Sequence, residues 1–221
     1  MKVTIIYDNT AWDKNLTCEW GFSCLVEVHG KIILFDTGAK GNVLLDNMRK
    51  LEIDPLKIDM VFISHDHWDH TGGLLDFLEK NQVKVYIPVS CIRTGNAVNI
   101  IQVDDPLKIY ENIYSTGELK NSEHSLVIKE GADVTVIAGC SHPGVREILR
   151  AASNFGKVNT LIGGFHGFND FELINDLENI CPTHCTRSIQ AIEILYPGKY
   201  INGGAGKVIE INSVRLEKSK L

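Results

Sequence analysis

Three histidines and two aspartates stand within six residues of the chain: His65, Asp66, His67, Asp69 and His70. Imidazole and carboxylate groups are the ligands that Zn²⁺ and related transition-metal ions take from proteins. The His-x-His spacing lets His65 and His67 converge on one ion from a tight loop. Asp69 and His70 can face a second ion, since paired ions in hydrolytic sites lie roughly 3.5–4 Å apart. Solvation of a surface loop does not require this spacing, so the cluster predicts a metal site.

The elements around the cluster must hold it in place. An apolar run at 59–63 precedes it as a buried strand, and apolar residues at helical spacing follow it. The predicted strands are Lys2–Tyr7, Phe22–Val28, Lys31–Phe35, Asp59–Ile63, Lys84–Ile87, Ser125–Lys129, Asp133–Ala138, Val158–Ile162 and Lys207–Ile211. The predicted helices are Asn42–Leu51, Gly72–Lys80, Val145–Ser153, Phe171–Glu178 and Ser188–Leu195. This alternation predicts an α/β fold, in which residues 91–124 form either a lid or a surface excursion.

Composition narrows the class of protein further. The 221 residues carry 22 Lys+Arg against 28 Asp+Glu, a formal charge of −6, and 44% of them are hydrophobic. These values indicate one globular domain over residues 1–221 and disfavour nucleic acid as a partner. No apolar run approaches the ~18–20 residues of a membrane helix, so we expect no membrane partner. The apolar run 3–7 is too short for a signal peptide, which predicts a cytoplasmic protein with reduced cysteines.

The pattern His65-x-His67-x-Asp69-His70 resembles the signature of the metallo-β-lactamase superfamily, and the similarity extends over nearly the whole chain. The segment 34–38 resembles the first motif of that superfamily, in which Asp36 supports the metal loop. The resemblance implies a four-layer αββα sandwich that binds two divalent ions. Zn²⁺ is the first choice, with Mn²⁺ and Fe²⁺ as alternatives, because His and Asp ligands suit several ions.

The resemblance also implies the functional residues. The metal ligands would be His65, His67, Asp69, His70, His142 and His184. Many members carry a bridging Asp after the strand that ends here at 161–164, whereas this chain offers His166. His166 would be a ligand or a proton donor, or water alone would bridge the ions. Asp66 would accept a proton or only brace its loop.

Five further residues carry two interpretations each. Asp36 would orient a ligating histidine or cap a turn. Cys185 would be a buried inert thiol or a thiolate near the second metal. Arg187 would hold an anionic substrate group or be a solvated charge. Glu19 and His124 would line the pocket or be exposed polar residues.

Four segments, 19–23, 139–144, 163–166 and 184–186, are together similar to the dihydropterin-ribofuranosylaminobenzene-phosphate-synthase-like subgroup. The predicted function is a metal-dependent hydrolase that uses a metal-bound hydroxide on a small ester, phosphoester or related substrate. The alternative is a bond-forming synthase of methanopterin-type pathways, and a third class is a metal-binding protein without catalysis. The substrate is a small molecule, and an anionic one suits a site that bound metal makes cationic. Substrate identity and oligomeric state stay open.

Overall fold

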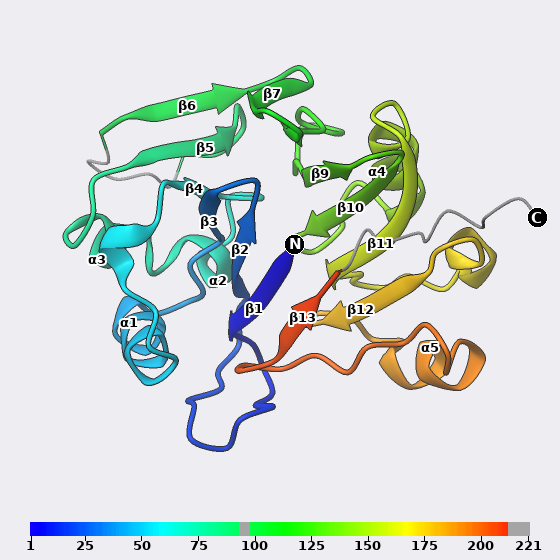
Figure 1. Cartoon of the computed structure of the whole chain (residues 1–221), viewed down its shortest axis with the longest axis horizontal. Coiled ribbons are helices and arrows are strands. Elements are labelled where there is room, and N and C mark those ends of the chain that lie inside the picture. The colour runs from blue at the N-terminus through cyan, green and yellow to red at the C-terminus, as the bar shows by residue number, and fades with distance from the viewer. Residues whose placement is uncertain (93–97, 212–221) are drawn as a thin grey trace, which may run out of the picture.

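The computed structural model describes residues 1–92 and 98–211 as two facing β-sheets with helices on their outer sides (Figure 1). The first sheet runs in the order β13 (Val208–Glu210), β1 (Lys2–Tyr7), β2 (Ser23–Val28), β3 (Lys31–Phe35), β4 (Met60–Phe62), β5 (Lys84–Pro88) and β6 (Ile100–Val103). The second runs in the order β12 (Asn179–Thr183), β11 (Lys157–Gly164), β10 (Asp133–Ala138), β9 (Leu126–Glu130), β8 (Ile113–Ser115) and β7 (Leu107–Tyr110). The helices are α1 (Gly41–Lys50), α2 (Trp68–Thr71), α3 (Leu74–Leu78), α4 (Val145–Ala152) and α5 (Ile189–Leu195), with 3₁₀ turns at Pro55–Lys57 and Phe171–Ile174.

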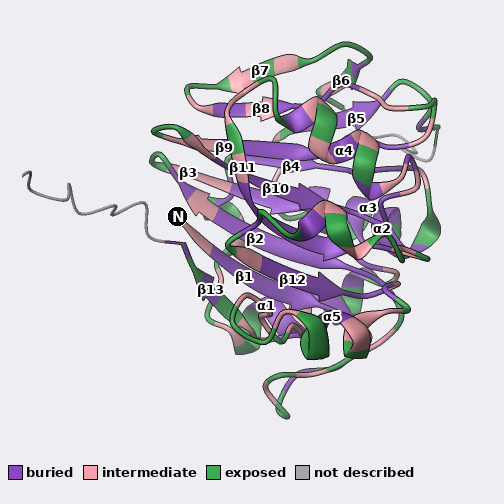
Figure 2. Ribbon diagram, turned by 90° about the vertical axis from the view of Figure 1, so that its right-hand side faces the viewer, coloured by how far each residue is buried: buried purple, intermediate pink, exposed green. Residues whose placement is uncertain are grey.

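Three apolar clusters hold these layers together. Phe35 and Phe62 of the first sheet pack against Ile137 and other inward-facing residues of the second. The outward-facing residues of the first sheet pack under α1 and α3, and those of the second pack under α4 and α5. Most strand residues are therefore buried, while the outer sides of the helices are exposed (Figure 2). The expected four-layer αββα sandwich is confirmed.

The strand directions bring the predicted metal ligands to one edge of the sandwich. Strands β3, β4, β5 and β6 run parallel to one another, and so do β10, β11 and β12. The β2–β3 hairpin turns at His29 and Gly30, as the sequence predicted. Ligands in such sheets bind beyond the carboxyl ends of parallel strands. The loops after β4, β10 and β12 carry the predicted metal ligands.

Two predicted helices differ from the structure. The predicted helix Gly72–Lys80 is the shorter helix α3, and an unpredicted helix, α2, ends just before Gly72. A Cβ at Gly72 would lie 2.1 Å from the backbone oxygen of Ala39, so glycine permits this close approach. The predicted helix Phe171–Glu178 is only a 3₁₀ turn, because the backbone N–H of Glu178 donates to Asn159 O at 2.7 Å and joins the sheet edge.

Four strands were missed by the sequence analysis. Strands β6, β7 and β8 lie within the stretch 91–124 that was expected to be irregular, and β12 precedes His184. Residues 93–97 of that stretch lie outside the described residues. Strands β6 and β7 lie at the edges of their sheets, and most of their residues are half-buried or exposed, which leaves a weak pattern of burial.

His124 lies in the core between the sheets, so both predicted positions for it, in a pocket wall or exposed, were wrong. Its ring stacks on Phe62 with centroids 4.0 Å apart. The ring Nε2 donates to Ile63 O at 2.7 Å, and the Ser115 hydroxyl lies 2.9 Å from Nδ1. Burial lowers the pKa of His124 to about 3, against the opposing effect of the Ile63 hydrogen bond. The imidazole is therefore a neutral crosslink between the loop after β4 and β8.

We expect His124 to make the chain acid-sensitive. Its folded-state pKa of about 3 lies below the ordinary value of 6.5, so the unfolded state binds the extra proton. The resulting stability is complete above about pH 6.5 and is lost as the pH falls toward 3. His124→Asn should therefore lower stability at pH 7 but flatten the pH dependence by roughly 1 kcal/mol per pH unit. Denaturant unfolding of chelator-treated protein between pH 7 and 4 measures this slope.

His29→Asn is the matched control, because His29 is exposed in the β2–β3 turn. Parallel pH curves for the His124 variant and the wild type would show that the buried imidazole contributes no acid sensitivity.

Candidate metal centre

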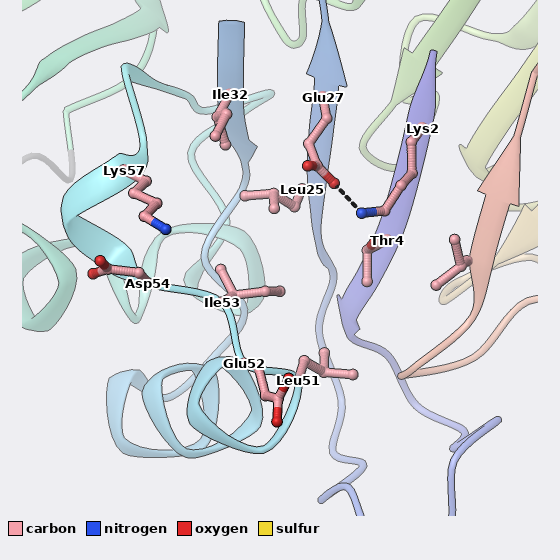
Figure 3. A pocket seen from close by; sticks show the side chains of 11 residues that line it. Lys2, Thr4, Leu25, Glu27, Ile32, Leu51, Glu52, Ile53, Asp54 and Lys57 are labelled. Atoms are coloured by element: carbon pink, nitrogen blue, oxygen red, sulfur yellow. Dashed lines mark ion pairs between the residues drawn. The ribbon is translucent and has the colours of Figure 1, made fainter.

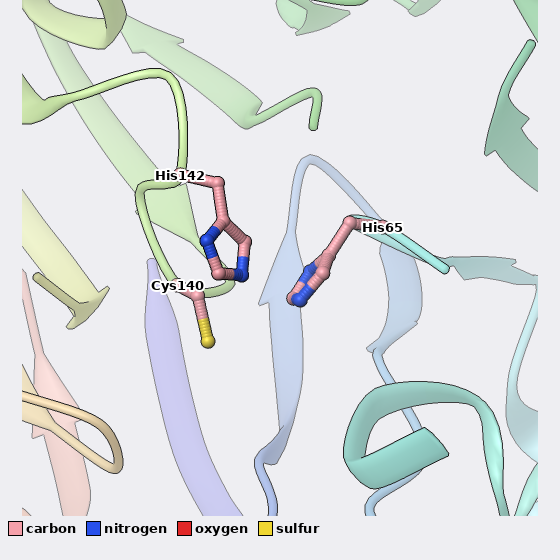
Figure 4. A group of neighbouring side chains, drawn as sticks. All are labelled: His65, Cys140 and His142. Carbon is pink, nitrogen blue, oxygen red and sulfur yellow. The ribbon is translucent and has the colours of Figure 1, made fainter. Parts of the chain in front are cut away.

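The six predicted ligands come together at the carboxyl ends of the parallel strands. His65 and His67 follow β4, and His142 follows β10 on the opposite sheet. Their ring centroids lie 4.5 Å (His65–His67), 4.7 Å (His67–His142) and 4.8 Å (His65–His142) apart. The side chains of His65 and His142 approach one another from the two sheets (Figure 4). These three imidazoles form the first donor group.

Asp69, His70 and His184 form the second donor group. The Nε2 atom of His184 lies 3.2 Å from Asp69 Oδ2, and His70 Nε2 lies 3.9 Å from the same oxygen. The two groups adjoin, because the ring centroids of His65 and His70 are 4.2 Å apart. The six predicted ligands therefore form two adjoining groups of three.

Hydrogen bonds determine which ring nitrogens face inward. The Ser64 hydroxyl donates to Asp36 Oδ2 at 2.7 Å, so the contact of 2.9 Å between Ser64 Oγ and His65 Nδ1 requires a proton on Nδ1. Likewise, Asn9 Oδ1 accepts from His184 Nδ1 at 3.0 Å. The Nε2 atoms of His65 and His184 therefore carry lone pairs, and both are buried without a hydrogen-bond partner.

These unpartnered nitrogens fit a divalent cation. Burial, followed by the nearby His70, lowers the pKa of His65 well below its usual value. Burial and the His67 imidazole lower the pKa of His142 to about 4. Both rings are neutral near pH 7, which is the ligating form of histidine. Converging neutral nitrogens beside the Asp69 carboxylate provide a donor set of the kind that Zn²⁺ and similar ions prefer.

The buried Asp36 carboxylate orients His70, as one of its two interpretations predicted. Its Oδ2 accepts from His70 Nδ1 at 2.7 Å, and its Oδ1 accepts from the backbone N–H of Ser64 at 2.7 Å. Burial lowers the pKa of His70, but the Asp36 charge and hydrogen bond outweigh it, so the net shift is upward. The hydrogen bond turns the Nε2 atom of His70 toward the donor groups.

Glu123 holds the loop that carries His142, and the sequence analysis missed it. Its Oε1 accepts from the backbone N–H groups of Gly139, Cys140 and Ser141, and its Oε2 accepts from that of His142, at 2.8–3.1 Å. Glu123 lies in a different loop from the residues it contacts, so spacing gives no local signal for this role.

Trp20 and Asn9 support the second donor group. Trp20 Nε1 donates to Asp69 Oδ2 at 2.8 Å, and its ring centroid lies 5.1 Å from that of His184. Trp20 stands in one of the segments similar to the synthase-like subgroup, so a signal for it existed. Asn9 follows β1 and also donates to His184 O at 2.9 Å. The N-terminal strand therefore contributes to a site built otherwise from later loops.

Two cysteines also lie at the centre. Cys140 Sγ is 3.2 Å from His70 Nε2, and it lies within 4.8 Å of the donor atoms of His65, His142 and His184. Cys185 is half-buried, and its Sγ lies 3.8 Å from Cys140 O. A hydrogen bond between the two thiols raises the pKa of Cys140 and lowers that of Cys185.

The two predicted catalytic residues lie at the periphery of the donor groups. The Asp66 carboxylate accepts from Ile92 N at 3.1 Å and from Cys91 Sγ at 3.5 Å, which favours the loop-bracing role. The ring of His166 lies 5.2 Å from that of His142 and belongs to neither donor group.

The remaining candidates lie outside the donor groups. Arg187 is exposed, and Glu19 forms an ion pair with Lys40 at 2.8 Å.

A cavity of about 400 Å³ opens beside the first donor group. It is lined by Ser141, His142, Gly144, Val145, Phe165, His166, Gly167, Phe168 and Asn169. A second cavity, of about 300 Å³, is lined by β1, β2 and the segment after α1, where Lys2 pairs with Glu27 at 2.6 Å (Figure 3). No histidine or cysteine lines that second cavity. Of these two cavities, the first is therefore the one that adjoins the donor groups.

Comparisons with known proteins show similarity to one superfamily. A family model of the metallo-beta-lactamase superfamily matches residues 20–91. The 7,8-dihydropterin-6-methyl-4-(beta-D-ribofuranosyl)-aminobenzene-5'-phosphate synthase of Methanocaldococcus jannaschii is 25% identical, with 83% of this chain and 86% of that protein aligned. An uncharacterized protein of the same organism is 26% identical, with 95% and 100% aligned. The predicted resemblance is confirmed.

Solved structures share the fold. A crystal structure of a metal-dependent hydrolase of the β-lactamase superfamily has a TM-score of 0.80 and 25% identity, covering 96% of this chain and 100% of that one. The human short-form tRNase Z, at 16% identity and a TM-score of 0.63, shares the fold alone. Among the described residues, no helix has the length and apolar character to cross a membrane.

We expect Asp36→Asn to weaken metal binding at the second donor group. The variant removes the charge that orients His70, and loss of such supporting partners typically costs 10–100-fold in metal affinity. Calorimetric titration of the chelator-treated protein with Zn²⁺ measures the change. The control is Asp46→Asn on the exposed side of α1, where Asp46 pairs with Arg49 and Lys50. An unchanged Zn²⁺ affinity in Asp36→Asn would show that Asp36 only caps a turn and does not support metal binding through His70.

Proposed function

We propose that this chain, which has the fold and the ligand motif of the metallo-β-lactamase superfamily, is a metal-dependent hydrolase. Its substrate would be a small ester, phosphoester or related molecule. The observation that carries the proposal is the pair of adjoining donor groups, with the buried Nε2 lone pairs of His65 and His184 directed inward beside an open cavity. The similar solved structure of a metal-dependent hydrolase supports the same class.

Two divalent ions would be held by His65, His67 and His142 and by Asp69, His70 and His184. When bound, such ions supply Lewis acidity that activates water as a nucleophile and polarises the electrophile. Asp36 and Asn9 keep the imidazoles of His70 and His184 in the ligating tautomer. Glu123 holds the loop of His142 through four backbone hydrogen bonds, so the donors need little rearrangement on binding.

The cavity residues would bind the substrate and move protons. Phe165 and Phe168 provide an apolar wall, and Asn169 provides an amide that can hydrogen-bond to a polar group. A ring nitrogen of His166 would donate a proton to the leaving group, since this ring lines the cavity next to His142 without joining a donor group. Asp66 would keep the segment at 91–92 in place.

A bond-forming synthase is the second candidate function. The observation in its favour is the 25% identity to the M. jannaschii dihydropterin-linked synthase over most of both chains. A cavity with the aromatic rings of Phe165 and Phe168 can accommodate a flat heterocycle such as a dihydropterin. In this alternative the ions would act as Lewis acids on a substrate that is bound in the same cavity.

A substrate panel with the metal-loaded chain tests both functions. We expect turnover of a phosphodiester, phosphomonoester or carboxylic ester, and a loss of at least about 10³-fold in His142→Ala, because the variant removes a donor of the first group. The panel includes a 7,8-dihydropterin whose 6-methyl carbon carries a leaving group, with an aminobenzene ribofuranosyl phosphate as the nucleophile that displaces it. His29→Ala controls for the loss of an exposed histidine.

The panel outcomes separate the candidate functions. Consumption of the dihydropterin without hydrolysis of any ester would replace the hydrolase by the synthase. Full activity after dialysis against a chelator would overturn both.

We expect His166→Asn to separate proton transfer from metal binding. The variant should retain two metal equivalents, because His166 lies outside both donor groups, while kcat falls by roughly 10²–10⁴-fold. Metal analysis of the dialysed protein and a pH–rate profile provide the two readouts. Loss of one metal equivalent would instead make His166 a ligand.

A further inference from the structure

The end of β11 has no room for a bridging side chain. A Cβ at Gly164 would lie 2.5 Å from Gly139 O and 2.6 Å from Cys185 Sγ, both closer than real contacts of this kind. A Cβ at Gly163 would lie 1.9 Å from Ala138 O. The two donor groups therefore cannot share a carboxylate from these positions, so any shared side-chain ligand must come from another position in the chain.

We propose that Cys140 supplies the shared ligand, a thiolate that binds both metal ions. Among the described residues, Cys140 belongs to two clusters of three possible ligands, one with His65 and His142 and the other with His70 and His184, and each cluster contains members of one donor group. The sulfur lies 3.2 Å from His70 Nε2. Figure 4 shows Cys140 and His142 side by side on one loop, across from His65.

The neighbouring nitrogens point to a cation at the same place. His65 Nε2 and His184 Nε2 are buried without a partner, and each belongs to one of the groups that Cys140 joins. Zn–S and Zn–N bonds of about 2.3 and 2.0–2.1 Å place sulfur and nitrogen roughly 3.6 Å apart around a tetrahedral ion. The sulfur lies 3.2 Å from His70 Nε2 and no more than 4.8 Å from the other three nitrogens, so all four are close enough for small side-chain shifts to bring them around bound ions.

The backbone keeps the sulfur in this position. Cys140 is 3% exposed, and its N–H donates to Glu123 Oε1 at 3.1 Å. The thiol loses its proton to solvent when the metal–sulfur bond forms, and no oxidant or further reactant is needed. A shared thiolate in place of a carboxylate makes the centre softer, which favours Zn²⁺ or Fe²⁺ over Mn²⁺.

This inference rests on the metal centre of the proposed function but not on hydrolysis. It is tested with Co²⁺ added to the full chelator-treated chain, because a thiolate bound to Co²⁺ gives an intense near-ultraviolet charge-transfer band. We expect the band and two metal equivalents in the wild type. Cys140→Ser should lose the band and bind the second equivalent at least about 10-fold more weakly. The matched control, Cys185→Ser, should keep the band, because Cys185 belongs to neither donor group.

Three outcomes overturn the inference in different ways. A band that persists in Cys140→Ser, or that disappears only in Cys185→Ser, excludes Cys140 as the ligand. A wild-type chain that binds two Co²⁺ ions without the band retains the metal centre but excludes any thiolate. If the wild-type chain binds no Co²⁺, both the metal centre and the proposed function are overturned.

A second measurement needs no folded Cys140 variant. X-ray absorption of the Zn²⁺-loaded wild type and Cys185→Ser should show a sulfur scatterer at about 2.3 Å in both. Its absence from the wild type, or its loss in Cys185→Ser, would overturn the inference.

Discussion

The buried carboxylate of Asp36 is the interaction on which the rest of the site depends. It lies at the end of β3 and accepts from the Ser64 backbone, the Ser64 hydroxyl and the His70 ring, each at 2.7 Å. An unpaired carboxylate in this position would be strongly unfavourable, so its three donors must stay in place. The constraint joins two parallel strands and orients two imidazoles at once, since Ser64 also contacts His65.

Glu123 is the corresponding constraint on the second sheet. It too is a buried carboxylate, but its donors are four successive backbone N–H groups, so it shapes a loop rather than a ring. The loop brings Cys140 and His142 to the first sheet's histidines. Asp36, Asp69 and Glu123 place three buried carboxylates at or beside the centre. Divalent ions would neutralise this concentration of negative charge. The acidic composition and a cation-binding site are therefore compatible.

The sandwich explains why such distant segments meet. The apolar inner faces hold the two sheets together, and the carboxyl ends of their parallel strands open on one shared edge. Asn9 after β1 and His184 after β12 are 175 positions apart in sequence but hydrogen-bond at 3.0 Å. His124 also stabilises this edge of the sandwich, because its neutral, buried ring connects the loop after β4 to strand β8.

The sequence by itself determined the chemistry and the class of fold. The motif at 65–70 needs only short-range spacing to bring ligands together, and the strand–helix alternation is a local pattern that predicted most of the strands with their bounds nearly right. The tertiary structure alone decided which distant groups complete the site. Glu123 and Asn9 carry no local signal, and the segment 139–144 does not reveal the position of Cys140, because these roles depend on contacts across the two sheets. The position of Cys140 between the donor groups, and the exclusion of a side chain at Gly164, follow from backbone packing that spacing along a chain does not encode.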